Sequence, residues 1–484
     1  MSTYAHTYLV SFWNPKCSQS GIAVLSILLF VGLSAITSFF VFLNSQHIHS
    51  ARNQKTADSL ATAKMALMAS ATSVDLSGNA RPGDLPCPDL NNDGIAEPAC
   101  SNVNGRALGR LPWRTLGLED LRDGYGERLW YAVSANFKNN PRTACVAPND
   151  VGCLNSESFG TITVRRPTGT ILLNGEANSG AVAVVFSPGA PLTRGGGSDV
   201  QNRSCELGVN CDASSLCTTN PASLTPLCNP ANYLDIANGE DNADFIDTTA
   251  NGFSQGPVMD NLGSVILNDR LVTIEYAEIL PLMERRVAKE VEACLVDYPS
   301  QSLTGNTRYP YAAAVIPGNV SPNYSDASAA LFGRIPDTPF NQTVNDGIYN
   351  LNLGPLGVIP IQTMSNTWSG KCNIVSDDGW WLNWKEQIFY GVADAFKPAP
   401  NYVGFSLNTA SCPNCLTINN TLAPQLNKRF VVIVAGNSLD GQIRINNSDK
   451  NSVSNYLEGE NSDADELYLQ QSSTDVFNDV LYYQ

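Results

Sequence analysis

The longest apolar run of the chain lies near its N-terminus, from Ile22 to Leu43, and contains no charged residue. As a helix it would be roughly 33 Å long, which is enough to cross a bilayer. It is too long for the apolar part of a secretory signal peptide, and no small-residue cleavage site follows it. The pattern therefore predicts a transmembrane helix that stays attached to the chain.

The helical pattern continues beyond this run. Ala57, Ala61, Met65 and Met68 recur every three or four residues through good helix formers, up to about Ser73. We therefore expect one N-terminal helix over 22–75, apolar on all sides in its first half and amphipathic in its second half.

A second helix is predicted from Glu278 to Val296, where an apolar stripe is formed by Leu280, Met283, Val287, Val291 and Cys294. Apolar runs predict strands at 160–166, 181–187, 271–276 and 429–435. The expected fold class is α+β, in which the transmembrane helix is followed by two tandem lobes, each a helix packed on an antiparallel sheet.

The expectation of two lobes comes from an internal repeat. The segment 129–138, LWYAVSANFK, matches 388–397, IFYGVADAFK. Further matches join 181–189 to 429–436, 232–235 to 455–458, and 265–272 to 476–481. A period this long indicates a duplicated domain rather than a solenoid. We predict a first lobe over 76–276, with a Cys-rich insertion at about 195–230, and a second lobe over 277–484.

Charge and histidine content narrow the function. With 29 Lys and Arg against 45 Asp and Glu, the net charge is −16, which disfavours nucleic acid as a partner. The three histidines are His6, His47 and His49, so neither lobe offers an imidazole base or a His-ligated zinc. We predict no catalytic residues; only a carboxylate-based glycosidase stays formally open.

All of the 13 cysteines except Cys17 follow the apolar run. Their even number there and the missing histidines favour disulfides over a metal site, and disulfides persist in oxidising compartments. We predict that neighbours pair: Cys87 with Cys100, Cys145 with Cys153, Cys205 with Cys211, Cys217 with Cys228, Cys294 with Cys372, and Cys412 with Cys415. The last pair has the spacing of a redox motif, but its loop surroundings favour a structural bridge.

The best small constellation for a ligand is a candidate calcium loop, formed by Asp89, Asn91, Asp93, Ile95 and Glu97. Oxygen ligands at the first, third and fifth positions, followed by a glycine, are typical of the start of such a loop. The twelfth position is Cys100 instead of the usual Glu, so the pattern is incomplete. The alternative is an acidic turn closed by a bridge between Cys87 and Cys100.

Two other groups of side chains have both a structural and a functional interpretation. Trp368, Trp380, Trp381 and Trp384 could form a sugar-binding platform, but we expect them in the core of the second lobe. The acidic runs 235–244 and 458–466 lack regular ligand spacing and are interpreted as solvated loops.

The N-terminus resembles that of type IV prepilins and pseudopilins. A polar leader ends at Gly21, Ile22 follows, and an apolar helix continues into an amphipathic one. Three later segments resemble large bacterial pilin-like proteins: PCPD at 86–89, RLPW at 110–113, and the segment from Asp123 to Ser134. The resemblance implies a leader over 1–21, cleavage by a prepilin peptidase between Gly21 and Ile22, methylation of the new N-terminus, and pilin-like lobes.

The resemblance also implies a function. The fifth residue of the expected mature chain is Ser26, where this family usually has Glu, and in this respect the chain is similar to minor pseudopilins at filament tips. The expected role is a structural minor pilin or pseudopilin of a type II secretion or type IV pilus filament. It would be held in the bacterial inner membrane by one span, with its lobes in the periplasm or on the cell surface.

The partners that the resemblance implies are other pilins or pseudopilins, the inner-membrane assembly platform, the prepilin peptidase and the membrane. The alternative function is that of a membrane-anchored surface adhesin or ligand-binding protein on the same scaffold.

Overall fold

The computed structural model describes residues 20–484, apart from 77–79, 101–106, 141, 143, 146–151, 195–198, 202, 204–229, 246–251, 299–308, 320–321, 323, 326–329, 340–347, 353–357, 364–366, 376–378, 399–411, 413 and 421. Most of the predicted leader lies outside the described residues, and so do five cysteines: Cys17, Cys205, Cys211, Cys217 and Cys228.

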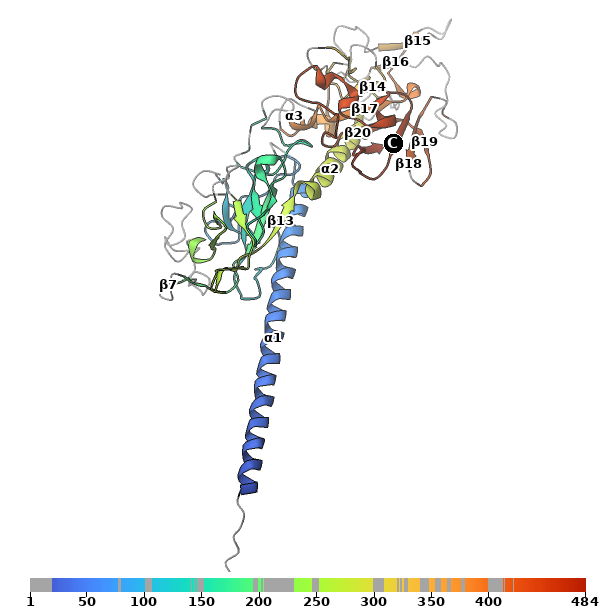
Figure 1. Ribbon diagram of the computed structural model, residues 1–484. Helices are drawn as coiled ribbons and strands as arrows, with labels where there is room; N and C mark the ends of the chain where they lie inside the picture. Colours follow the sequence, from blue (N-terminus) through green and yellow to red (C-terminus); the bar gives the residue numbers. More distant parts are fainter. Residues whose placement is uncertain are drawn as a thin grey trace, which may run out of the picture.

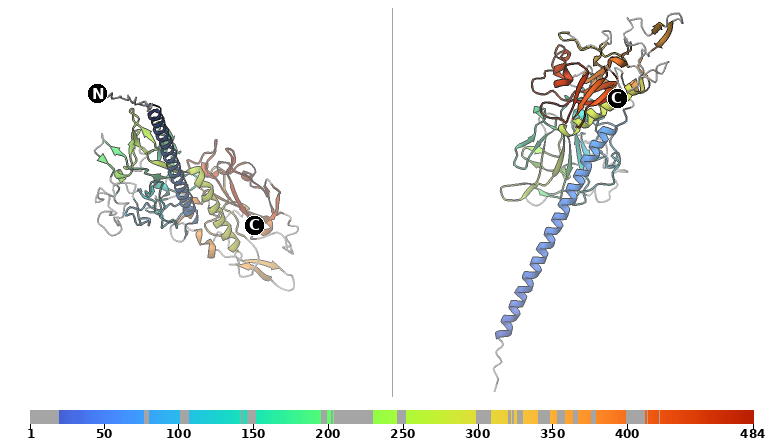
Figure 2. Two further views of the ribbon diagram at one scale, coloured as in Figure 1. Left: turned by 90° about the horizontal axis from the view of Figure 1, so that it is seen from below. Right: turned by 90° about the vertical axis from the view of Figure 1, so that its right-hand side faces the viewer.

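The N-terminal helix forms a long stalk. α1 runs from Ser20 to Ser73, 54 residues, and its N-terminal half extends away from the two lobes (Figures 1 and 2). Every described side chain of α1 before Thr56 is exposed. From there on Leu60, Ala63, Leu67 and Ala71 are buried at helical spacing. The C-terminal third of α1 therefore packs on the protein.

The prediction of a transmembrane helix is wrong. Within the part of the chain that the structure describes, no helix is both long and apolar enough to cross a membrane. The expected single-pass placement in the inner membrane is corrected by the same finding.

A four-stranded antiparallel sheet forms the centre of the first lobe, in the order β1-β2-β5-β13. Its strands are β1 (Leu108–Arg110), β2 (Trp130–Val133), β5 (Ala181–Ser187) and β13 (Arg270–Glu275). The central strand β5 is apolar along nearly its whole length because both of its faces are covered. Ala183 and Val185 pack in the core that contains α1, whereas Val184 and Phe186 pack in a second cluster.

The second lobe repeats this arrangement. Its four-stranded antiparallel sheet has the order β14-β17-β20-β22, with β14 (Phe332–Arg334), β17 (Ile388–Val392), β20 (Phe430–Val434) and β22 (Val480–Tyr483). α2 (Tyr276–Asp297) contacts β20 and β22, in the way that α1 contacts β5 and β13. A capping box between Glu275 and Glu278 fixes the start of α2.

The predicted fold class, with one antiparallel sheet in each lobe, is too simple. Two three-stranded sheets contain parallel pairs: β3 (Thr163–Arg165) with β10 (Gly252–Ser254), and β18 (Leu416–Asn420) with β21 (Leu467–Gln470). Their third strands are β4 (Ile171–Leu173) and β19 (Gln425–Lys428). The remaining short strands form two-stranded pairs: β6 (Thr193–Arg194) with β7 (Asp199–Val200), β8 (Ile236–Ala237) with β9 (Glu240–Asp241), β11 (Val258–Met259) with β12 (Val265–Leu267), and β15 (Ile348–Asn352) with β16 (Val358–Thr363).

One hydrophobic core runs through both lobes. It extends from Leu60 on α1, through Val287 on α2, to Ile433 on β20. Trp381 and Trp384, on the short helix α3 (Trp381–Trp384), are almost completely buried in it. The interpretation of the tryptophans as core residues is therefore confirmed for these two side chains.

A buried polar network joins the loops of the first lobe. Arg203 donates to the carbonyl of Tyr233 at 3.1 Å, and Gln201 donates to Asp235 Oδ1 at 2.8 Å. Asp269 Oδ2 accepts from Asn242 Nδ2 and from the backbone N–H of Asp235, both at 2.9 Å. The acceptor Asp269 is fully buried, so these bonds replace its hydration.

The same network recurs in the second lobe. Arg444 donates to the carbonyl of Tyr456 at 3.4 Å, and Gln442 donates to Glu458 Oε1 at 2.8 Å. Asp479 Oδ2 accepts from Asn461 Nδ2 at 2.9 Å and from the backbone N–H of Glu458 at 3.2 Å. The two lobes thus share a sheet order and a polar network. Gln201 and Arg203 lie in the stretch interpreted as an insertion, yet both have these counterparts.

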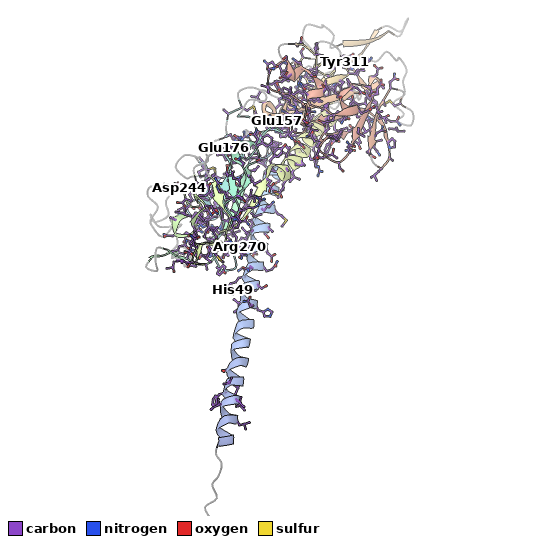
Figure 3. All side chains as sticks on the ribbon, viewed as in Figure 1. His49, Glu157, Glu176, Asp244, Arg270 and Tyr311 are labelled. Atoms are coloured by element: carbon purple, nitrogen blue, oxygen red, sulfur yellow. A yellow bond between two sulfur atoms is a disulfide. The ribbon has the colours of Figure 1, made fainter. Side chains whose placement is uncertain are left out.

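A segment of the first lobe joins the two lobes. Asn155 Nδ2 donates to the carbonyl of Asn383 at 2.9 Å, and Asn383 Oδ1 accepts from the backbone N–H of Leu154 at 2.8 Å. Glu157, which lies at the boundary between the lobes in Figure 3, pairs with Arg444 and accepts from Ser438 Oγ at 3.0 Å. The lobes are therefore joined by charge-assisted as well as neutral hydrogen bonds.

Replacing Glu157 with Gln is expected to lower the free energy of unfolding by about 2 kcal/mol, because the Arg444 side chain is only 4% exposed and loses its counter-charge. Urea denaturation of the full chain measures the effect. Glu176→Gln is the control, since Glu176 lines the same cleft between the lobes and is exposed. Equal stabilities of the two variants would contradict a stabilising role for the pair.

All four predicted disulfides whose cysteines lie among the described residues are present: Cys87–Cys100, Cys145–Cys153, Cys294–Cys372 and Cys412–Cys415. The other two predicted pairs lie outside the described residues. Cys294 is buried near the end of α2, and Cys372 lies in the short helical segment Gly370–Ile374. Cys415 directly precedes β18. The Cys412–Cys415 pair therefore leads into a strand, not into the helix that would lower a catalytic thiol pKa.

Candidate functional site

The exposed half of α1 is the most unusual surface of the molecule. Its described side chains include seven large apolar ones that are each more than half exposed: Leu25, Ile27, Leu28, Leu29, Phe30, Val31 and Leu33. No Asp, Glu, Lys or Arg occurs in α1 before Arg52. An apolar surface of this extent marks an interaction site, because a monomer gains nothing by exposing it to water.

The segment around Asp123 holds the helix where it enters the first lobe. The backbone N–H of Gly124 donates to Thr56 Oγ1 at 3.0 Å, and Ser59 Oγ donates to the carbonyl of Arg122 at 2.8 Å. A Cβ on Gly124 would lie 2.1 Å from the backbone oxygen of Arg52, so only glycine allows this approach. We call residues 122–125 the clasp.

Asp123 shapes the clasp from inside. Its side chain is fully buried, and Oδ1 accepts from the backbone N–H groups of Tyr125 at 2.8 Å and Glu127 at 3.0 Å. Oδ2 accepts from Ser187 Oγ at 2.7 Å, at the end of β5. The carboxylate thus ties the clasp to the central sheet, and this explains the role of the acidic residue that opens the segment from Asp123 to Ser134.

A second segment holds the C-terminal end of the stalk. The backbone N–H of Gly83 donates to the carbonyl of Ala71 at 2.9 Å, and Arg81 pairs with Asp84 at 2.9 Å. Both charged side chains are nearly completely buried. Because an unpaired buried charge is costly, the pair keeps this segment in one conformation against α1.

The candidate calcium loop forms a compact turn. Asp89 Oδ1 accepts from the backbone N–H of Asn92 and Oδ2 from that of Gly94, both at 2.7 Å. Asn91 Oδ1 accepts from the N–H of Asp93 at 3.0 Å, and Asp93 Oδ1 from that of Ile95 at 2.7 Å. Glu97 Oε1 accepts from the N–H of Leu90 at 3.3 Å.

The side-chain oxygens of this loop therefore accept hydrogen bonds from backbone N–H groups. Only their remaining lone pairs could coordinate an ion. Asp89, Asp93 and Glu97 do not form a group with ligand atoms within 4.8 Å of one another, whereas another trio of described residues does. The Cys87–Cys100 disulfide closes the turn, as the structural alternative requires. Calcium binding at this loop stays a prediction.

The burial of Asp89 determines the pH range in which this loop could bind calcium. Desolvation raises the pKa of Asp89 to about 7, an effect reinforced by the nearby Asp93 and opposed by the hydrogen bond from Gly94. A calcium ion needs the ionised form, so it has to displace a proton from Asp89 at lower pH. We therefore expect calcium affinity to rise with pH through this value.

At about pH 8, about 5 mM calcium is expected to stabilise the full chain by about 1 kcal/mol, if the site has the millimolar affinity of loose calcium modules. The thermal midpoint measures this. Asp89→Asn should remove the shift, and Asp260→Asn, which changes a comparable turn in the first lobe, should keep it. An unchanged midpoint in the wild-type protein at this calcium concentration would rule the site out.

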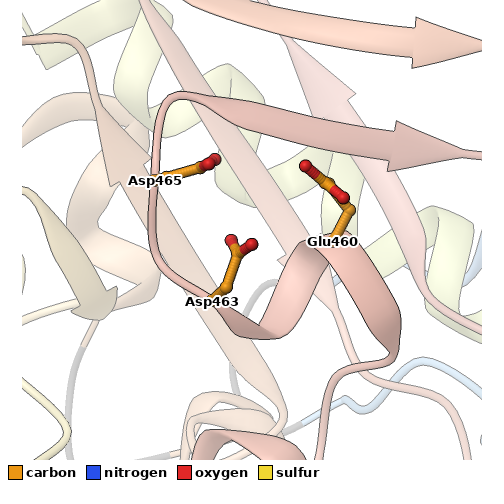
Figure 4. Close-up of side chains that lie close together, drawn as sticks. All are labelled: Glu460, Asp463 and Asp465. Atoms are coloured by element: carbon orange, nitrogen blue, oxygen red, sulfur yellow. The ribbon is translucent and has the colours of Figure 1, made fainter.

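One acidic cluster was not expected from the sequence. Glu460, Asp463 and Asp465 lie close together in the loop before β21, with carboxylate oxygens within 4.8 Å of one another (Figure 4). Asp463 and Asp465 are exposed, and Asp465 Oδ1 accepts from the backbone N–H of Leu467. The interpretation of this run as a solvated loop holds for these two residues. The irregular spacing in the sequence gave no sign that the three would converge.

The predicted cleavage site lies at the very start of the described chain. Gly21 and Ile22 belong to the first turn of α1. The structure does not bring them near the lobes, so cleavage at this bond would leave both lobes and the clasp unchanged.

The clasp and the segment around Arg81 and Asp84 thus hold α1 against the first lobe. Comparison with known proteins adds no independent assignment: no family model, no curated protein and no solved structure matches this chain.

Proposed function

We propose that the protein is a structural subunit of a pilin-like filament, of the minor pilin or pseudopilin type found in type II secretion and type IV pilus systems. The observation that carries the proposal is the exposed half of α1, which is apolar and stands clear of both lobes. In a filament such a helix is covered by the helices of neighbouring subunits, and burial of its apolar side chains drives the association.

The way α1 is held supports the same role. The clasp and the Arg81–Asp84 segment bind it over its C-terminal third, so the stalk has a fixed direction relative to the lobes. A rigid stalk loses little conformational entropy on packing, which favours ordered assembly. Because α1 contains no Asp, Glu, Lys or Arg before Arg52, shape and apolar contact, not ion pairs, would determine its packing.

The double head favours the end of a filament. The first lobe lies beside the C-terminal end of α1, and the second lobe lies beyond that end and on the other side of the helix axis, as Figures 1 and 2 show. A head of this width would collide with neighbours in a regular helical shaft, whereas the tip leaves one side free. Ser26, in place of the family's glutamate, is consistent with a subunit that has none above it.

The partners of this proposal are other pilin-like subunits, an assembly platform and a prepilin peptidase. Mass spectrometry of the protein purified from its native cells tests the processing step. A mature chain that begins at Ile22, with or without methylation, is the expected result. A chain that still begins at Met1 would contradict processing by a prepilin peptidase.

A further inference from the structure

Basic side chains lie on α1 between the apolar half of the stalk and the first lobe. His47, Ala51 and Lys55 follow one another at four-residue spacing, and Arg52 lies beside them, three residues before Lys55. All four side chains are exposed. His49, in the same stretch of α1, stands clear of both lobes in Figure 3. We call His47, Arg52 and Lys55 the basic face.

The two cations of the basic face have no acidic partner within the part of the chain that the structure describes. The Arg52 guanidinium lies 5.1 Å from the centre of the Tyr125 ring. This stacking uses the flat side of the guanidinium and leaves the N–H donors in its plane available to an anion. Asp58, the only acidic residue of α1, accepts a hydrogen bond from Gln54 Nε2 at 2.8 Å instead.

The rest of the chain has the opposite charge. Residues 74–484 contain 25 Lys and Arg against 44 Asp and Glu, a net charge of −19, because only four of the chain's cations and one of its acidic residues precede them. The remaining cation of α1, Lys64, pairs with Glu278 of α2 at 2.5 Å. Lobes of this composition repel one another and attract an exposed basic surface.

The position of the basic face determines which part of a neighbour reaches it. In the proposed filament, on which this inference rests, the apolar half of α1 packs along parallel helices of other subunits. Parallel helices place all lobes toward the same end of the filament. A neighbour displaced toward the N-terminal end of α1 therefore brings its lobes to the level of the basic face.

We propose that the basic face binds carboxylates on the lobe of a neighbouring pilin-like subunit. Arg52 offers planar N–H donors that match a carboxylate, and Lys55 offers three donors on a flexible stem. The ring of His47 adds a further N–H donor. Apolar packing is non-directional, so it defines the axial position of a neighbour only loosely, whereas paired charges fix it.

A photo-crosslinking amino acid at Ala51, in the full chain expressed in its native cells, tests the proposal. Ala51 is exposed and lies one turn before Lys55, so the probe samples the basic face without removing a charge. We expect adducts with the lobe of a pilin-like subunit, which mass spectrometry should map to segments rich in Asp and Glu. The same probe at Phe30 samples the apolar half of the stalk.

Removing the two charges should weaken the contact. Arg52→Gln with Lys55→Gln is expected to lower the yield of lobe adducts at Ala51 at least about threefold, the effect of losing two exposed ion pairs. Arg52→Lys with Lys55→Arg retains both charges and should retain most adducts. Lys289→Gln with Lys371→Gln is the matched control, because it removes the same charge from exposed positions of the second lobe.

Salt distinguishes the basic face from the apolar half of the stalk. In isolated cell envelopes, about 0.5 M NaCl should lower the yield of lobe adducts at Ala51, because salt screens exposed charges. Adducts at Phe30 should keep their yield, since apolar burial does not depend on this attraction.

Several results would overturn the proposal. These are adducts at Ala51 chiefly with phospholipid or with N-terminal helices, equal yields of lobe adducts in the wild type and in Arg52→Gln with Lys55→Gln, and adducts at Phe30 without lobe adducts at Ala51. If neither Ala51 nor Phe30 formed protein adducts, the proposed function itself would be contradicted, and this inference with it.

Discussion

Replacing Gly124 with valine is expected to release the stalk from the first lobe and to lower the free energy of unfolding by about 3 kcal/mol. The added Cβ would lie 2.1 Å from the backbone oxygen of Arg52 and 2.6 Å from its carbonyl carbon. Backbone atoms form both sides of this contact, so no side-chain rotation can relieve it. Chemical denaturation of the full chain measures the loss.

Gly32→Val is the matched control for this substitution. Gly32 lies on the free part of the same helix, and a Cβ there would meet nothing within 4 Å. Hydrogen exchange should show faster exchange of the α1 amides beyond Thr56 in Gly124→Val and not in Gly32→Val. Unchanged protection in Gly124→Val would show that the clasp does not hold the helix.

Replacing both Cys294 and Cys372 with serine is expected to lower the free energy of unfolding by about 4 kcal/mol. The bridge closes a loop with a sequence separation of 78 residues, and a cross-link over this length strongly restricts the unfolded chain. It also ties the end of α2 to the segment Gly370–Ile374, next to the tryptophan core. Denaturation under non-reducing conditions measures the difference.

The double variant Cys412→Ser, Cys415→Ser is the control, because that bridge has a sequence separation of only 3 residues. Its loss should cost much less than the loss of the long bridge. If the two double variants lost equal stability, the Cys294–Cys372 bridge would not have the long-range role assigned to it.

Local patterns predicted the main elements well. The expected second helix, from Glu278 to Val296, is α2, and the run at 181–187 coincides with β5. α2 has apolar residues at helical spacing, and β5 is a continuous apolar run. Both patterns arise because these residues are buried. The prediction of a membrane helix was wrong. It relied only on the absence of charged residues from 22 to 43, and a helix with an apolar surface can also be covered by other proteins.

What could not be predicted depends on contacts between distant residues. Glu284 and Asp479 are far apart in the chain and line the same cavity only because α2 packs beside β22. The clasp was visible as a motif around Asp123, but its role became clear only from the contact of Gly124 with α1. The loop oxygens of Asp89 and its neighbours could be predicted as ligands, but not their bonds to backbone amides.

The central claim is that the exposed half of α1 packs against helices of similar subunits. Its most direct test is a photo-crosslinking amino acid at Phe30, which is 73% exposed on the free stalk, in the full chain expressed in its native cells. Leu262, 90% exposed on the first lobe, is the control position. Adducts at Phe30, but not at Leu262, with the N-terminal helices of pilin-like subunits are the expected result. The absence of protein adducts at Phe30 would contradict this claim.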